Sequence, residues 1–274
     1  GKAGEGPQEF MLRGGAGLMV FPYKDYLLIN SLGKISYFSK DGKFQKEVMT
    51  RSPMMIGYFQ PTPGGDFAGL GFTFDNDKQS AFMTLNLYDE KFTKIKEIAR
   101  QKFFSRGRLE FPMIIPVFIV DGNSIFMAGE TGFVMNKYDL DGNKKVLITR
   151  DYSLLKVTGE YKEKVHNFFK TNPASKAAYE NIKNMITFLD RFPAIYLFQI
   201  DSKKIYIITY LEEKGKYETF IYGTDGKFIK RLFLPINYQN VMQADPYTFY
   251  KNKFYHLIEN EDTEQWELHA IKIE

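Results

Sequence analysis

Short runs rich in Leu, Ile, Val, Tyr and Phe, separated by turn residues, follow one another along most of the chain. In the first part of the sequence these runs occupy 17–21, 25–30, 34–38 and 43–49. Runs of this length, bounded by Gly, Asp and Asn, are typical of β-strands, whereas a helix needs a longer stretch with a 3.6-residue period. The pattern therefore predicts an all-β chain outside one segment in its second half.

A hairpin built around a tyrosine recurs along the sequence, at Tyr37, Tyr88, Tyr138 and Tyr222. Successive tyrosines are 51, 50 and 84 residues apart. Three of the four hairpins turn at an Asp-Gly pair, whose glycine accepts the positive φ of a tight turn. The second hairpin departs from this pattern and has Asp89-Glu90-Lys91 in the corresponding place. The spacing indicates a repeat of about fifty residues with one insertion.

The later repeats divide into strands in the same way. These strands are expected at 53–60, 67–74, 79–88 and 92–99, at 113–120, 124–129, 132–139 and 144–149, at 194–200, 204–210, 217–223 and 228–234, and at 245–250, 253–259 and 264–273. Four short strands in each repeat of about fifty residues are the signature of a β-propeller blade. The sequence therefore predicts a single β-propeller domain over 1–274, with four-stranded antiparallel blades and three clear strands in the last one.

The segment 151–191 interrupts the repeat and has helical periodicity. Apolar residues recur at helical spacing in two stretches, first Tyr161, Val165, Phe168 and Phe169, then Ala178, Ile182, Met185, Ile186 and Leu189. Asn172-Pro173 is expected to begin the second helix, as N-cap and first helical residue, and Phe192-Pro193 to end it. We expect a helical insert between two blades, which either covers one face of the propeller as a lid or docking surface or packs on its rim.

Composition and charge exclude several classes of protein. With 274 residues, 44% of them apolar and 26% charged, the chain is typical of a globular protein with a full core. A net charge of +4 is too small to imply a nucleic-acid partner, and the absence of Cys excludes disulfides and thiol catalysis. No apolar run is long enough to span a membrane. Because the chain begins with Gly and has no signal peptide, we expect a processed or trimmed N-terminus.

The first ten residues resemble a segment of a known family. Gly1-Lys-Ala-Gly-Glu-Gly-Pro7-Gln-Glu-Phe10 is similar to the Gly-Lys-Gly-x-Gly-Pro-Gly-Glu-Phe segment of bacterial six-bladed β-propellers related to NHL repeats, although Gln8 replaces a glycine. The resemblance implies a six-bladed ring, of which this chain shows five units and the end of a missing first one. A five-bladed ring closed by 1–10 is the competing interpretation. The resemblance also implies a periplasmic, outer-surface or secreted protein, often lipid-anchored through a removed N-terminus, and it carries over no catalytic residues.

Candidate metal sites are weak, and no metal or cofactor is expected. Asp139-Leu-Asp141-Gly142-Asn143 resembles the start of a calcium loop, but neither its glycine nor its twelfth position fits an EF-hand. His166, His256 and His269 lack the short spacing of zinc ligands. A propeller hydrolase or lyase with a metal in its central channel is the alternative function, with candidate ligands Asp66, Asp121, Asp201 and Asp245 that also fit as turn residues.

The arginines are distributed unevenly over the predicted fold. By the strand boundaries above, the links between blades hold seven of the eight arginines, whereas the lysines follow segment length. Guanidinium groups bind carboxylate and phosphate bidentately. We therefore predict a non-catalytic binding or scaffold propeller whose anionic ligand or acidic protein partner docks on an arginine-rich face, formed by Arg51, Arg106, Arg108, Arg150 and Arg191. The competing interpretation is that these arginines bind loop carbonyls and neighbouring blades.

Overall fold

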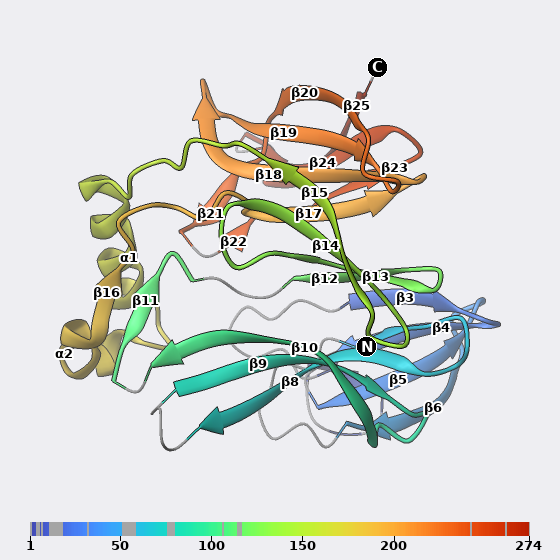
Figure 1. Ribbon diagram of the computed structural model, residues 1–274. Helices are drawn as coiled ribbons and strands as arrows, with labels where there is room; N and C mark the ends of the chain where they lie inside the picture. The colour runs from blue at the N-terminus through green and yellow to red at the C-terminus, as the bar shows by residue number, and fades with distance from the viewer. Residues whose placement is uncertain are drawn as a thin grey trace. The chain divides into compact units, whose positions relative to one another are not determined.

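The computed structural model describes residues 2–3, 6, 8–10, 19–31, 33–50, 59–75, 80–105, 107–113, 117–241, 243–260 and 262–273 (Figure 1). The chain divides into two compact units. Unit 1 consists of Gly1–Arg106, Val120–Phe126 and Lys137–Lys145, and unit 2 consists of Gly107–Ile119, Met127–Asn136 and Val146–Glu274. The single domain expected over 1–274 stays a prediction.

The protein is all-β and is built from antiparallel blades of the β-propeller class. Four sheets have four strands in chain order, and the last has three. They are blade A, β3 (Met19–Tyr23), β4 (Tyr26–Ser31), β5 (Lys34–Ser39) and β6 (Phe44–Met49); blade B, β7 (Phe59–Pro61), β8 (Phe67–Asp75), β9 (Ser80–Tyr88) and β10 (Lys94–Ser105); blade C, β12 (Phe118–Asp121), β13 (Ser124–Ala128), β14 (Phe133–Asp139) and β15 (Lys144–Arg150); blade D, β17 (Leu197–Asp201), β18 (Lys204–Glu213), β19 (Lys216–Gly223) and β20 (Phe228–Leu234); and blade E, β23 (Tyr247–Tyr250), β24 (Lys253–Asn260) and β25 (Gln265–Lys272). Figure 1 draws blades A and B in blue to green and blades D and E in orange to red.

The predicted blade architecture is confirmed, including the three strands of the last blade. Most strand boundaries agree with the sequence pattern within a few residues. The start of the strand predicted at 53–60 lies outside the described residues. Among described boundaries the largest difference is at β10, whose predicted end is 99 and which continues to Ser105. It can continue because β9 offers backbone partners as far as Ser80, which lies opposite Ser105. The described residues form five blades, matching the five units seen in the sequence, and the six-bladed design that the resemblance implies stays a prediction.

Blades A and B share a hydrophobic core within unit 1. Leu28, Ile35 and Tyr37 of blade A form one cluster with Phe59 and Phe67 of blade B, each at most 5% exposed. A buried amide adds a polar link, because Asn30 Nδ2 donates to the Phe59 carbonyl at 3.1 Å. Apolar residues on the facing sides of blades A and B thus form one core, as stacked sheets require.

Blades D and E share a second core within unit 2. Tyr206 is fully buried and stacks on Phe249, with ring centroids 4.0 Å apart. Gln199 on the first strand of blade D accepts a hydrogen bond from the Phe249 backbone at 3.1 Å. In unit 1, Gln60 accepts one from the Val120 backbone at 2.9 Å in the same manner. A glutamine side chain therefore links the first strands of blades B and C, and another links those of blades D and E.

The N-terminal segment that resembles the propeller family packs on blade A. Gly6 and Glu9 form a turn, in which the Glu9 backbone N–H donates to Gly6 and the Glu9 carboxylate accepts from the Gly6 N–H. Lys34, only 1% exposed, donates to the Gly6 carbonyl at 2.7 Å and pairs with Glu47 at 3.2 Å. The short β2 (Glu9–Phe10) runs parallel to β1 (Lys2–Ala3). The family-like residues thus have a structural role at this edge of blade A.

The insert contains one regular helix, α1 (Gly159–Thr171), where the first helix is expected. Thr158 is its N-cap and accepts from the Tyr161 N–H, and Val165 is fully buried. Val165 packs in a cluster with Phe111 and Ile186. Val165, on the apolar stripe of the helix, thus packs in a local core with residues outside the blades.

The second predicted helix is wrong over much of its length. Asn172 is the C-cap of α1, and the helical residues that follow form only η1 (Lys176–Ala178), α2 (Tyr179–Ile182) and η2 (Lys183–Met185). Ile186–Phe188 is a strand, β16, paired in parallel with β11 (Leu109–Phe111). These β-branched and aromatic residues satisfy their backbone on a strand that is distant in sequence, which local periodicity does not reveal.

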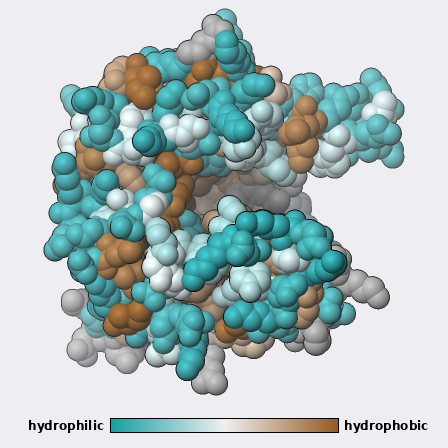
Figure 2. All heavy atoms as spheres, turned by 90° about the vertical axis from the view of Figure 1, so that its right-hand side faces the viewer, coloured by the Kyte–Doolittle hydropathy of each residue, from teal (hydrophilic) through white to brown (hydrophobic). Residues whose placement is uncertain are grey.

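On the face drawn in Figure 2, hydrophobic side chains form small separate groups among hydrophilic ones. Among the described residues, no helix is long and apolar enough to cross a membrane.

Candidate functional site

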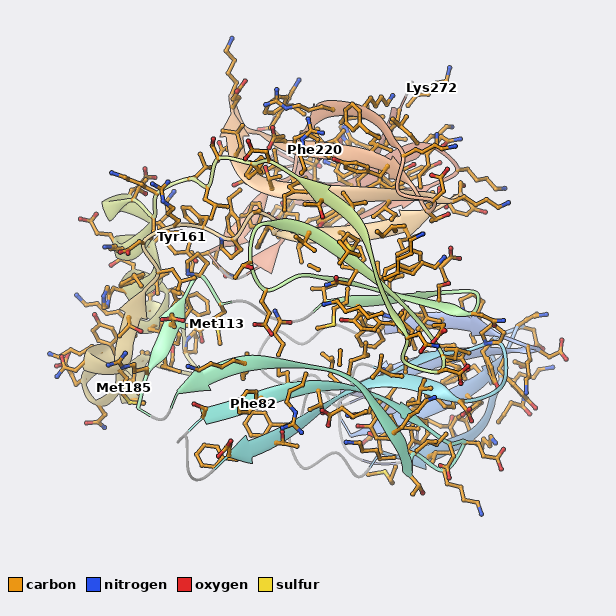
Figure 3. The ribbon with its side chains drawn as sticks, viewed as in Figure 1. Phe82, Met113, Tyr161, Met185, Phe220 and Lys272 are labelled. Carbon is orange, nitrogen blue, oxygen red and sulfur yellow. The ribbon has the colours of Figure 1, made fainter. Side chains whose placement is uncertain are left out.

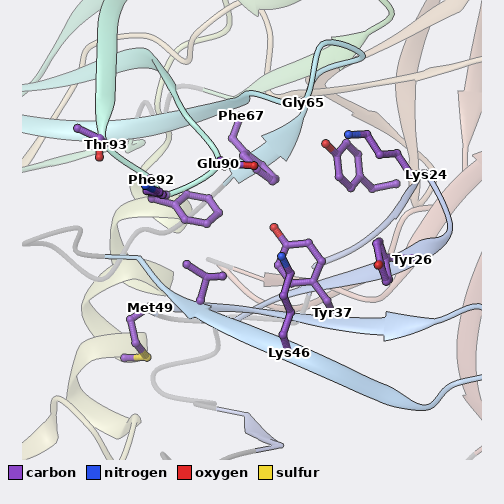
Figure 4. A pocket seen from close by; sticks show the side chains of 13 residues that line it. Lys24, Tyr26, Tyr37, Lys46, Met49, Gly65, Phe67, Glu90, Phe92 and Thr93 are labelled. Atoms are coloured by element: carbon purple, nitrogen blue, oxygen red, sulfur yellow. The ribbon is translucent and has the colours of Figure 1, made fainter.

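A cavity of about 860 Å³ opens in unit 1 where turns of blades A and B meet (Figure 4). Its lining includes Tyr23, Lys24 and Tyr26 from the first turn of blade A, and Lys46 beside Tyr37 on its outer strands. Blade B contributes Gly65 and the segment 90–93. We call this cavity the lysine–tyrosine pocket.

Phe92 forms part of the pocket wall in a backbone conformation that favours glycine. Its φ is +60°, and its N–H donates to Asp89. In blades A, C and D the residue with the same turn hydrogen bond is Gly42, Gly142 or Gly226, each with positive φ. A bulky residue in this region is strained, and such strain is commonly found at functional sites.

The Phe92 ring explains how this conformation is held. It is 8% exposed and contacts Phe67 and Phe59, with centroid distances of 4.7 and 5.0 Å. Aromatic packing of this kind offsets a local backbone cost. The result is an apolar floor beneath the charged groups of the pocket.

Three lysines and one glutamate give the pocket an excess of positive charge. The Lys46 ammonium lies 4.7 Å from the centre of the Tyr37 ring, and Lys24 lies 5.0 Å from that of Tyr23. Among the described residues, no carboxylate lies within ion-pair distance of Lys24, Lys46 or Lys91, although Glu90 is on the pocket lining. Lys24 donates a hydrogen bond to the Tyr23 hydroxyl, and this bond raises the pKa of Lys24.

The tyrosines add neutral hydrogen-bonding groups. Burial, with smaller effects of Tyr23 and Glu90, raises the pKa of Tyr37 to about 12, so its hydroxyl stays protonated at neutral pH. Figure 4 shows Tyr37 and Lys46 side by side, with their polar ends directed into the cavity. Gly65 lies close to the Tyr23 hydroxyl, since a Cβ there would be 3.4 Å from that oxygen. The pocket therefore combines cations, hydroxyl donors and aromatic surface, the groups that bind an anion carrying an apolar portion.

Sequence reasoning did not identify this pocket, although the sequence contains one signal for it. The departure of 89–92 from the Asp-Gly turn marks the strained Phe92. The sequence contains no comparable signal for Lys24, Lys46 and Lys91, because these lysines come from separate turns and strands that only the fold brings together.

The arginine-rich face predicted from the sequence is only partly covered by the described residues. Arg51 and Arg106 lie outside them, and Arg108 is exposed. Arg191 donates to the Leu154 carbonyl at 2.7 Å. These observations do not test whether the five arginines bind a ligand together, and that face stays a prediction.

Arg150 is engaged inside unit 2. Its guanidinium donates to the Tyr222 hydroxyl at 3.1 Å and lies 4.5 Å from the centre of the Phe220 ring. It is also the last residue of β15, and Arg100 is within β10, so both belong to strands rather than links. The link assignment of these two arginines is corrected, because the strands extend further than the sequence pattern indicated.

The residues considered as metal ligands are dispersed. Among the described residues, no group of three or more His, Cys, Asp or Glu side chains is close enough to hold a metal ion. His256 and His269 are neighbours on β24 and β25, with Glu267 bonded to His269 at 2.9 Å. Asp139 accepts from the Asp141 and Asn143 backbone N–H groups, as in an ordinary turn.

Comparison with known proteins supports the fold class alone. No family model and no curated protein matches the chain. A protein from Bacteroides fragilis, described as exported, is 12% identical over 94% of this chain and 69% of its own, with a TM-score of 0.54. A hydrazine synthase from Kuenenia stuttgartiensis is 11% identical over 91% and 60% of the two chains, with a TM-score of 0.42. A protein of unknown function from Bacteroides caccae is 10% identical over 79% and 65%, with a TM-score of 0.39.

Proposed function

We propose that this protein is a non-catalytic binding propeller of the bacterial cell envelope, and that its ligand is an anion with an apolar portion. The ligand enters the lysine–tyrosine pocket. Its charged group binds Lys46 and the Tyr37 hydroxyl, while its apolar portion rests against Phe92. The envelope location is supported by the resemblance of the N-terminal segment and by the exported description of the Bacteroides fragilis protein.

The observation that carries the proposal is the replacement of a turn glycine by Phe92. The other blades show that glycine forms the same turn with no strain. A phenylalanine there costs backbone energy but supplies the apolar floor under cations that no carboxylate among the described residues pairs with. An apolar surface next to these cations favours an anionic ligand that carries an apolar portion.

The proposal is tested by titrating the full chain with phenyl phosphate, and with benzyl alcohol as the neutral analogue, in a calorimeter. We expect phenyl phosphate to bind and benzyl alcohol to bind much more weakly. Replacing Lys46→Gln should weaken phenyl phosphate binding by roughly ten- to a hundredfold, because a charge-assisted hydrogen bond contributes about 1.5–3 kcal/mol. Binding should also weaken as sodium chloride is raised, since the cations are exposed.

The matched control is Lys43→Gln. Lys43 is on the same blade, pairs with Asp41 and lies outside the pocket lining. Its replacement should leave the affinity unchanged. Equal binding of the neutral analogue, or equal effects of the two lysine variants, would show that the pocket does not select anions.

A further inference from the structure

Unit 2 contains a second cavity, of about 930 Å³, that the proposed function does not use. It lies between α1 and the far ends of β18 and β19, where Tyr210, Leu211 and Tyr217 meet the helical insert. The start of the insert and β21 (Tyr238–Asn240) complete the lining. Figure 3 labels Tyr161, which α1 contributes to this cavity. We call it the insert pocket.

Seven of the residues that line it are aromatic. Phe192 stacks on Tyr210 with centroids 4.5 Å apart, and Tyr161 meets Phe192 edge-on at 4.9 Å. Tyr217 and Tyr238 form a further pair at 5.0 Å. Each of these rings packs against another, so the wall is formed before any ligand arrives. The rings are nevertheless only partly buried, and their remaining surface faces the cavity.

The charged side chains around these rings add up to no net charge. The lining holds two lysines and two glutamates. Glu160 pairs with Lys164 at 2.6 Å, and Glu212 accepts from the Tyr217 hydroxyl at 3.2 Å. Burial raises the pKa of Tyr161, Tyr210 and Tyr217, so their hydroxyls remain donors at neutral pH. Asn167 on α1 adds an amide.

A ligand for this pocket needs an apolar face for the rings, several groups that both donate and accept hydrogen bonds, and no net charge. A pyranose ring has all three, since its C–H groups form an apolar face and its hydroxyls ring the edge. We propose that the insert pocket binds a neutral saccharide, with sugar faces stacked on the aromatic wall and hydroxyls bonded to the tyrosine and amide groups. A cavity of this size accommodates a few sugar units.

The experiment titrates the full chain with maltohexaose, cellohexaose, xylohexaose and mannohexaose, followed by saturation-transfer NMR. We expect at least one of them to bind and its ring protons to receive saturation. Phe168→Ala should weaken that binding by about tenfold or more, because Phe168 is a partly exposed ring of the lining whose loss leaves the buried Val165 in place. Asn167→Ala, an exposed change on the same helix, should weaken it by a smaller factor and checks the result if Phe168→Ala folds poorly.

Trp266→Ala is the matched control, because Trp266 is 49% exposed in the same unit and outside the insert pocket. It should bind the saccharide as the unchanged protein does. The proposal is overturned if none of the four saccharides binds, or if Trp266→Ala weakens binding and Phe168→Ala does not. Neither result bears on the lysine–tyrosine pocket, whose probes and variants belong to unit 1.

Discussion

At the scale of single residues, Glu218 shows how a buried charge is held in this fold. It is 2% exposed, and its carboxylate accepts from the Tyr152 hydroxyl, the Thr209 hydroxyl and Arg231 Nε at 2.8, 2.7 and 2.6 Å. Replacing Glu218→Gln keeps the shape but turns one acceptor into a donor that faces other donors. We expect the free energy of unfolding in urea to fall by about 2–4 kcal/mol.

Glu97→Gln provides the comparison for Glu218. Glu97 also pairs with an arginine, Arg100, at 2.9 Å, but both side chains are more exposed than Glu218. Replacing Glu97→Gln should lower the free energy of unfolding by less than about 1 kcal/mol. Equal losses for the two variants would contradict the view that burial, rather than pairing itself, makes Glu218 important.

His256 gives the fold a dependence on pH. It is 6% exposed, and burial, followed by the nearby His269, lowers its pKa, while Asp245 opposes the shift. Below the unfolded pKa of 6.5 the unfolded chain takes up a proton that the folded chain resists. The free energy of unfolding should therefore fall between about pH 7.5 and about pH 5.5, and His256→Gln should reduce that slope.

His269→Gln is the control for this titration, because it removes only a smaller cause of the shift. We expect it to keep most of the pH dependence in urea unfolding. If His269→Gln removes the slope and His256→Gln does not, the exposed histidine is responsible and burial is not the cause.

At the scale of elements, the turns between outer strands distinguish two roles of glycine. Gly42 and Gly226 have φ values of +83° and +90° in equivalent turns. A Cβ on Gly42 would meet nothing within 4 Å, whereas one on Gly226 would lie 2.6 Å from the Leu147 carbonyl oxygen. Gly42→Ala should therefore lower the free energy of unfolding by about 1 kcal/mol, because of the backbone conformation alone. Gly226→Ala should lower it clearly more, because the close contact with Leu147 is added.

The measurement for both alanine variants is urea unfolding of each full chain. The difference between them isolates the close approach to blade C, since the backbone term is common to both. A loss for Gly42→Ala as large as that for Gly226→Ala would mean that backbone conformation dominates at both turns and that the contact with Leu147 contributes nothing.

Elements whose signals are local could be predicted from the sequence, and those with distant partners could not. Alternating apolar residues and Asp-Gly turns locate the strands of blades A to E, because strand period and turn chemistry are properties of a few neighbouring residues. The apolar spacing predicts a helix at Ile186–Phe188, whereas the segment is a strand whose partner, Leu109–Phe111, is far away in sequence. Its apolar spacing fits both structures, and only the partner decides between them.

At the scale of the whole molecule, the repeat makes exceptions visible. Four blades use the same hairpin, so a residue that departs from it, such as Phe92 in place of glycine, can be recognised by comparing the blades. Neither candidate pocket could be predicted, because each gathers side chains from several turns or from the insert. The assignment of Arg100 and Arg150 to links between blades depended on predicted strand ends, and backbone pairing extends the strands past those ends.

The most direct test of the central claim is a crystal structure of the protein soaked with 4-bromophenyl phosphate, whose bromine is located by its anomalous scattering. The account predicts a bromine peak next to Phe92 in the lysine–tyrosine pocket, with phosphate oxygens within hydrogen-bond distance of Lys46 Nζ and the Tyr37 hydroxyl. A bromine peak confined to another site, or a pocket that holds only water at a saturating concentration, would contradict it.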